Sequence, residues 1–145
     1  MTTTTNKGLT DPDYGDLNWN VPLNANFDII DKALGSAVDI SVTGLIGTQT
    51  LTAAQYQNLV LNFTGTLTAN LIYQVPSGVG GQWVISNNTT GAYTITFRTG
   101  AAGTSILVPN FETGITVHSN GTDVYQGGNS NFVTVKDFGA VGEDR

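Results

Sequence analysis

The chain has 145 residues, enough for one domain of ordinary size with a small appendage. It holds no cysteine, which excludes a disulfide framework, a thiolate metal site and a cysteine nucleophile. Five basic and eleven acidic residues give a formal net charge of −6, and this disfavours nucleic acid as a partner because phosphate binding needs clustered Lys and Arg.

The composition is that of a β protein. Thr, Asn and Gly are abundant, whereas Lys and Glu are scarce, and such side chains suit the exposed faces of sheets. No apolar run approaches the roughly 20 residues of a membrane span. The first residues also lack the basic and apolar regions of a secretory signal. We therefore predict a mainly β, extracellular-style or virion-style protein without membrane insertion.

The first zone, residues 1–38, contains a predicted helix from Asn24 to Leu34. Asn24 or Asn26 is a suitable N-cap, Pro22 suits a helix start, and Gly35 suits the C′ position.

Apolar residues of this helix recur at spacings of four, three and four, which places them on one face. They are Leu23, Phe27, Ile30 and Leu34. A helix of about three turns is marginal alone in water. Its apolar face must therefore pack either on its own domain or on a docking partner or further copies of the chain.

The second zone, residues 39–127, predicts a small β-sandwich or barrel of seven or eight short strands. Residues 57–75 hold two extended runs around Gly65, and residues 81–100 look like a hairpin with an Asn-Asn-Thr-Thr-Gly turn. The Asn120-Gly121 pair predicts another hairpin. In residues 51–58, Thr52 either caps one helical turn or lies in a bridge between strands.

The third zone, residues 128–145, reads as a linker followed by the start of another element. Gly127 to Asn131 are flexible and polar in composition, and an alternating apolar pattern follows them. We place a domain boundary near Gly128.

Candidate chemistry is sparse. His118, the one histidine, has no second histidine or cysteine with which to form a metal site or a dyad. The acidic residues Asp11, Asp13 and Asp16 read as turn formers and helix-dipole partners. We therefore predict no catalytic, cofactor-binding or metal-binding residues and no enzymatic activity within this chain.

Four aromatic residues leave room for another reading, that of a carbohydrate-binding module. Their rings either stack on sugars or pack in the core, and their alternation along predicted strands favours the core. They are Trp83, Tyr93, Phe97 and Tyr125.

Residues 8–35, GLTDPDYGDLNWNVPLNANFDIIDKALG, resemble the opening of tail fibre and tailspike proteins of tailed bacteriophages. Those openings carry Gly and Asp, a Trp, and then a Leu-Asn-x-Asn-Phe-Asp-x-Ile-Asp helix. The matching positions are Trp19, Leu23, Asn24, Asn26, Phe27, Asp28, Ile30 and Asp31. Residues 80–125 are similar to the β domain that often follows.

Residues 133–142, VTVKDFGAVG, look like the first turn of the right-handed parallel β-helix of the pectate-lyase-like superfamily. The match runs from Val135 to Gly142, and the last three residues depart from the usual Asp-Gly continuation. One coil cannot bury its own apolar face, so we expect the β-helix body to lie beyond residue 145.

The resemblance implies a structural virion protein: the N-terminal anchor of a homotrimeric tail fibre or tailspike, docked to the tail or baseplate. The implied docking or trimer-contact residues are Trp19, Leu23, Phe27, Ile30 and Leu34. Host adhesion through a surface glycan would belong to the C-terminal body. The alternative is a polysaccharide-degrading tailspike whose catalytic β-helix lies outside this chain.

Overall fold

A computed structural model describes residues 1–127, and it confirms the prediction of a mainly β protein. The predicted linker beyond Gly127 and the predicted β-helix start at residues 133–142 lie outside the described residues. The helices are α1 (Asn20–Gly35) and α2 (Ala53–Tyr56). The strands are β1 (Thr2–Thr3), β2 (Thr10–Asp11), β3 (Ala37–Ser41), β4 (Gly47–Thr50), β5 (Val60–Thr66), β6 (Leu71–Val75), β7 (Gly80–Thr90), β8 (Ile95–Thr99), β9 (Ser105–Val108), β10 (Ile115–Asn120) and β11 (Val124–Gly127).

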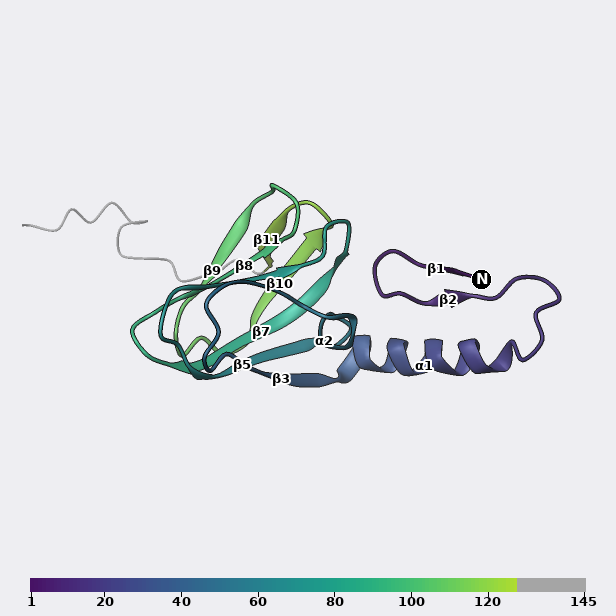
Figure 1. Ribbon diagram of the computed structural model, residues 1–145, viewed down its shortest axis with the longest axis horizontal. Helices are drawn as coiled ribbons and strands as arrows, with labels where there is room; N and C mark the ends of the chain where they lie inside the picture. Colours follow the sequence, from purple (N-terminus) through teal and green to yellow (C-terminus); the bar gives the residue numbers. More distant parts are fainter. Residues whose placement is uncertain (128–145) are drawn as a thin grey trace, which may run out of the picture.

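The molecule has two parts, a β domain and a helical projection (Figure 1). Strands β3 to β11 form the β domain. Helix α1 extends away from it, and the short β1–β2 hairpin runs alongside α1. In the part of the chain that the structure describes, neither helix is long and apolar enough to cross a membrane.

Helix α1 is longer than predicted and begins four residues earlier, at Asn20. Trp19 occupies the N-cap position without a side-chain cap bond, so the prediction of Asn24 or Asn26 as the cap was wrong. Pro22 falls in the first turn, where its missing N–H is no loss. Gly35 is the last helical residue, not a left-handed C′ residue, and Ser36 leads in extended conformation into β3.

The β domain is built from three successive coils of chain. Strands β3, β5 and β7 pair in parallel in one sheet, and β4, β6 and β8 pair in parallel in the other. The chain runs alternately through the two sheets, so each coil stacks on the one before it. Paired residues of successive coils are about 24 positions apart in the sequence, as are Leu71 and Ile95. This arrangement is a short parallel solenoid.

The predicted hairpin over residues 81–100 was wrong. Its two halves, β7 and β8, belong to different sheets and do not pair with each other. Gly91, at φ +105°, makes the turn that carries the chain from one sheet to the other. Alternation within each strand accounts for the buried Trp83 and Ile85 of β7 and Ile95 and Phe97 of β8, but it holds no information about which strand is the neighbour.

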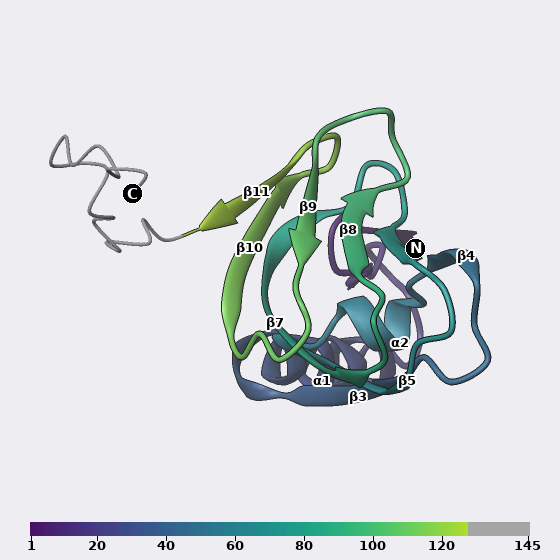
Figure 2. The same cartoon turned by 90° about the vertical axis from the view of Figure 1, so that its left-hand side faces the viewer.

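Three antiparallel strands complete the two sheets after the last coil. β9 pairs with β8, and β10 pairs with β7, so the final sheet orders are β11-β10-β7-β5-β3 and β4-β6-β8-β9 (Figure 2). The hairpin predicted at Asn120-Gly121 is confirmed: β10 and β11 pair there, with Ser119 opposite Val124 and Gly121 at φ +97°.

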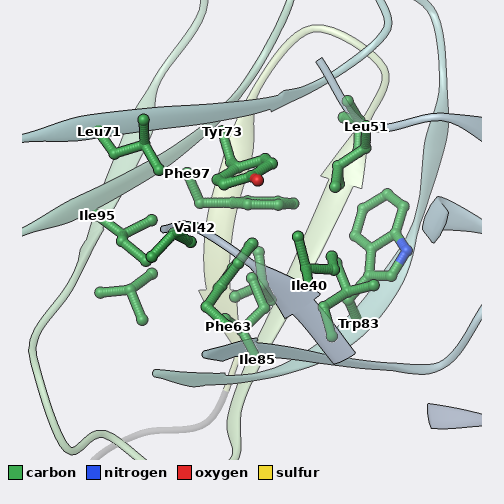
Figure 3. Packing of buried hydrophobic residues seen from close by; sticks show 14 of the residues in the cluster. Ile40, Val42, Leu51, Phe63, Leu71, Tyr73, Trp83, Ile85, Ile95 and Phe97 are labelled. Atoms are coloured by element: carbon green, nitrogen blue, oxygen red, sulfur yellow. The ribbon is translucent and has the colours of Figure 1, made fainter. Parts of the chain in front are cut away.

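The core lies between the two sheets. Its largest fully buried side chains are Trp83, Phe63 and Phe97. Phe63 of β5 meets Tyr73 of β6 with ring centroids 4.7 Å apart, and Trp83 of β7 meets Phe97 of β8 at 6.0 Å (Figure 3). Because each pair joins opposite sheets, these aromatic contacts hold the two sheets together.

Polar side chains link successive coils on the outside. The Asn62 amide donates to Asp39 Oδ1 at 2.7 Å, and the Asn88 amide donates to Asn62 Oδ1 at 2.6 Å. The hydroxyls of Thr66 and Thr90, 24 residues apart, lie 3.0 Å from each other. The Thr- and Asn-rich composition therefore has a structural use as cross-strand ladders.

The open question at residues 51–58 is answered by a single helical turn, α2. Thr52 precedes it, and the Gln55 side chain accepts a 2.9 Å hydrogen bond from the Thr52 N–H. This is the reciprocal contact of a capping box, and it allows so short a helix to form in the connection between β4 and β5.

Gly91→Ala is expected to lower the free energy of unfolding by about 2–4 kcal/mol. The residue has φ +105°, and an added Cβ would lie 2.4 Å from the carbonyl oxygen of Leu67. Gly35→Ala is the control, because nothing lies within 4 Å of its Cβ position and alanine favours the helix. Urea denaturation followed by circular dichroism measures both; equal losses in the two variants would contradict the assigned turn.

Candidate docking surface

The predicted contact residues lie on and beside α1, and four of the five are exposed. The helix has no buried residue, and the exposed fractions are 57% for Trp19, 58% for Phe27, 41% for Ile30 and 75% for Leu34. Leu23 is half-buried. We call these five residues the α1 stripe. The alternative in which the helix packs its apolar face on its own domain is thereby excluded for the described chain.

The arm, residues 1–18, packs on a neighbouring face of α1 and leaves the stripe open. The Asn26 side chain accepts the Thr10 N–H and donates to the Thr10 carbonyl, both at 2.7 Å. This two-way amide pairing resembles one step of a β ladder. Asn26 thus serves to hold the arm instead of capping the helix.

The other end of α1 is tied into the β domain. The Lys32 carbonyl accepts the N–H groups of Ser36 and Leu59, both at 3.1 Å, and the Val60 N–H donates to Ser36 at 3.0 Å. The Lys32 carbonyl thus gains a second donor from Leu59, just before β5, and the first residue of β5 bonds the C-cap residue Ser36. The helix therefore joins the domain without an intervening flexible segment.

The chain enters α1 at the end of the projection distant from the β domain (Figure 1), and this entry segment carries further exposed apolar residues. Tyr14, Leu17 and Val21 are fully or largely exposed. We call Tyr14, Leu17, Trp19 and Val21 the tip. Trp19 belongs to both the tip and the α1 stripe. Sequence reasoning selected Trp19 alone from this group, although apolar residues scattered through such a polar stretch were a usable signal.

Acidic groups accompany this surface. Asp28 and Asp31 are exposed on α1, while Asp13 pairs with the amino group of Met1 and raises the pKa of that amine. Asp16 accepts a 2.8 Å hydrogen bond from the Asp13 N–H, which confirms a turn-forming role. The first turn of α1 itself holds no acidic residue, and the helix-dipole role of the three preceding aspartates stays a prediction.

The remaining titratable groups do not assemble into a site. His118 is exposed and stacks on Tyr125 with ring centroids 5.2 Å apart. A hydrogen bond from the Thr104 N–H to Asp123 lowers the pKa of that carboxyl, and burial raises the pKa of Tyr73. Within residues 1–127 no ligand-sized cavity is present, and no three His, Asp or Glu side chains lie close enough to hold a metal.

The four aromatic residues considered for sugar stacking divide into two pairs. Trp83 and Phe97 are fully buried, so their rings are used in the core. Tyr93 and Tyr125 are about 40% exposed. Tyr93 precedes β8, whereas Tyr125 lies in β11, and β8 and β11 belong to different sheets. The structure does not bring the four rings together into one binding face.

No protein-family model, curated protein or solved structure matches this chain.

Proposed function

We propose that the chain is the N-terminal anchor of a trimeric phage tail fibre or tailspike, a structural virion component that attaches a receptor-binding body to the tail or baseplate. The observation that carries the proposal is the α1 stripe. Trp19, Phe27, Ile30 and Leu34 present large apolar side chains on a helix that contributes nothing to the core of its own domain.

Physical chemistry supports an intermolecular role for this helix. Sixteen residues of α-helix are near the lower limit of stability in water, and most helices gain stability by burying an apolar face. Exposed apolar groups of this kind mark contact surfaces. The stripe fits packing between copies of the chain, and the tip fits contact with a tail protein.

The β domain would act as a rigid spacer between the anchor and the body. Its two sheets are closely packed, and α1 enters at one edge through β3, while β11 at the opposite edge of the same sheet leads to the predicted linker. In this proposal residues 133–142 begin a parallel β-helix body, which would carry host adhesion.

Light scattering coupled to size-exclusion chromatography tests the proposal. We expect the mass of a trimer, together with binding to tail particles that lack this protein. A monomer that binds no tail component would refute the anchoring role. A monomer that still binds tails would refute the trimer while retaining the docking function.

A further inference from the structure

The turn of the β1–β2 hairpin is bound to the β domain at a site formed by residues distant from it in the sequence. We call this the arm site, and it consists of Tyr56, Gln57, Gly80, Gly81 and Trp83. The bound residues are Asn6 and Lys7, which contact it across separations of 49 to 74 residues.

Three hydrogen bonds hold the two residues there. The Lys7 ammonium donates to the Tyr56 carbonyl at 3.2 Å, and the Gln57 side chain donates to the Lys7 carbonyl at 2.8 Å. The Gly80 N–H donates to Asn6 Oδ1 at 2.8 Å. Both backbone and side chains of the bound segment are therefore recognised, as in complexes with peptides.

An aromatic ring adds a fourth contact. The Lys7 ammonium lies 5.2 Å from the centroid of Trp83, within the range of a cation–π interaction. The indole N–H donates to the Tyr56 carbonyl at 2.8 Å, so this one carbonyl accepts both Trp83 and Lys7. The shared acceptor fixes the ring under the cation.

The two glycines leave space for the bound segment. A Cβ on Gly80 would lie 3.1 Å from Asn6 Oδ1, and a Cβ on Gly81 would lie 3.2 Å from the Trp83 ring and 3.6 Å from Lys7 Nζ. Side chains at these positions would crowd the contacts. Burial lowers the pKa of Lys7, and its partners are a carbonyl and a ring, so the contact is specific without an opposing carboxylate.

The same arm is also bound to α1, through the Thr10 and Asn26 hydrogen bonds. The arm therefore connects the helix and the β domain at a second point, in addition to the covalent junction at Ser36. Figure 1 shows the hairpin and α1 side by side, with the hairpin turn directed toward the β domain. Two separated attachments restrain a projecting rod far better than one.

We propose that the arm site is a peptide-binding site for the chain's own Asn6–Lys7 segment, and that the arm, when bound there, fixes the direction of α1 relative to the β domain. We call the arm in this bound state the strap. With the strap detached, α1 is joined to the domain through Ser36 and the start of β5 alone. The inference goes beyond the anchoring role and does not depend on it.

Trypsin cleavage after Lys7 tests the binding half of the proposal in the full chain, because Lys7 must leave the arm site to enter the protease. Cleavage in the native protein is expected to be at least tenfold slower than in the urea-unfolded chain. Asn6→Ala is expected to speed it about fivefold, since one hydrogen bond is lost. Thr113→Ala, an exposed substitution in a distant loop, is the control.

Equal cleavage rates in native and unfolded protein, or no change in Asn6→Ala relative to the control, would overturn the binding site. Asn6 is exposed, so its substitution leaves the core intact. A second variant, Gln57→Ala, should also speed cleavage.

Spin-label distances test the restraint on α1. The chain has no cysteine, so Asp28→Cys and Thr48→Cys, both at exposed positions, give two unique labels on α1 and β4. A single narrow distance distribution is expected, broadening when Lys7→Met or Asn6→Ala is added. If Asn6→Ala speeds Lys7 cleavage but leaves the distance distribution unchanged, the restraint on α1 is overturned while the binding site stands.

Discussion

Trp83→Ala is expected to lower the free energy of unfolding by about 3–5 kcal/mol, the usual cost of removing a large aromatic from a core. Trp83 is fully buried, contacts Phe97 of the opposite sheet and donates its indole N–H to the Tyr56 carbonyl. Alanine would leave a cavity between the sheets and remove the ring beneath Lys7. Urea titration followed by circular dichroism measures the change.

Trp19→Ala is the matched control for this prediction. It removes the same side chain from a position that is 57% exposed in the single chain, so the unfolding free energy of the monomer, measured at a concentration where the chains are dissociated, should change by less than about 1 kcal/mol. If the dependence of the unfolding free energy on urea concentration has the same slope in both variants, the difference between them is a difference in stability. A similar loss of unfolding free energy in Trp83→Ala and Trp19→Ala would contradict the assignment of Trp83 to the core.

Phe27→Lys combined with Ile30→Lys is expected to convert the proposed trimer to a monomer without unfolding the chain. Both side chains are exposed in the single chain, so their replacement removes no contact within the core. Lysine forms helices at least as well as phenylalanine or isoleucine, and the first of the two introduced ammonium groups would lie one turn before Asp31. Where the α1 stripes of two copies pack together, however, the two introduced charges would be buried without partners, which is unfavourable.

Mass by light scattering and helix content by circular dichroism measure the two expected results. Asn24→Lys combined with Ala25→Lys is the control, since it adds the same charge at exposed positions outside the stripe. The control should keep the mass of the native protein. A double stripe variant with unchanged mass would show that α1 is not the contact between copies.

The buried faces of the strands could be predicted from alternation. Leu71, Tyr73 and Val75 recur in the sequence with a period of two, and all three are buried. Alternation sets which side chains face inward, because that depends on the pleat of one strand alone. It does not set which strand lies alongside, because pairing is decided by residues about 24 positions apart.

A signal for this pairing is present in the sequence. Val60-Leu61 and Val84-Ile85 occupy equivalent positions in successive coils, as do Tyr73 and Phe97. Comparing the chain with itself at an offset of 24 would have suggested a solenoid instead of a hairpin. The repeat is weak because the outward-facing positions are free to vary among polar residues.

The helix was recognised from its stripe, but its beginning and its surroundings were not. Local capping rules favoured Asn24 or Asn26, whereas Asn26 is used for the contact with Thr10. The arm site had no readable signal, because Lys7 has no acidic partner there and the contacts join residues separated by 49 to 74 positions. Such contacts follow from the tertiary fold and from no local pattern.

The place where the strap is attached affects how the molecule would bear a mechanical load. A pull transmitted through α1 alone would reach β3, an edge strand, and would peel it from β5 one hydrogen bond at a time. The strap instead joins the arm to Gly80 and Trp83 in β7, the central strand of the same sheet. Tension applied through the arm is therefore shared with a strand that is paired on both sides, and less of it reaches the edge strand β3.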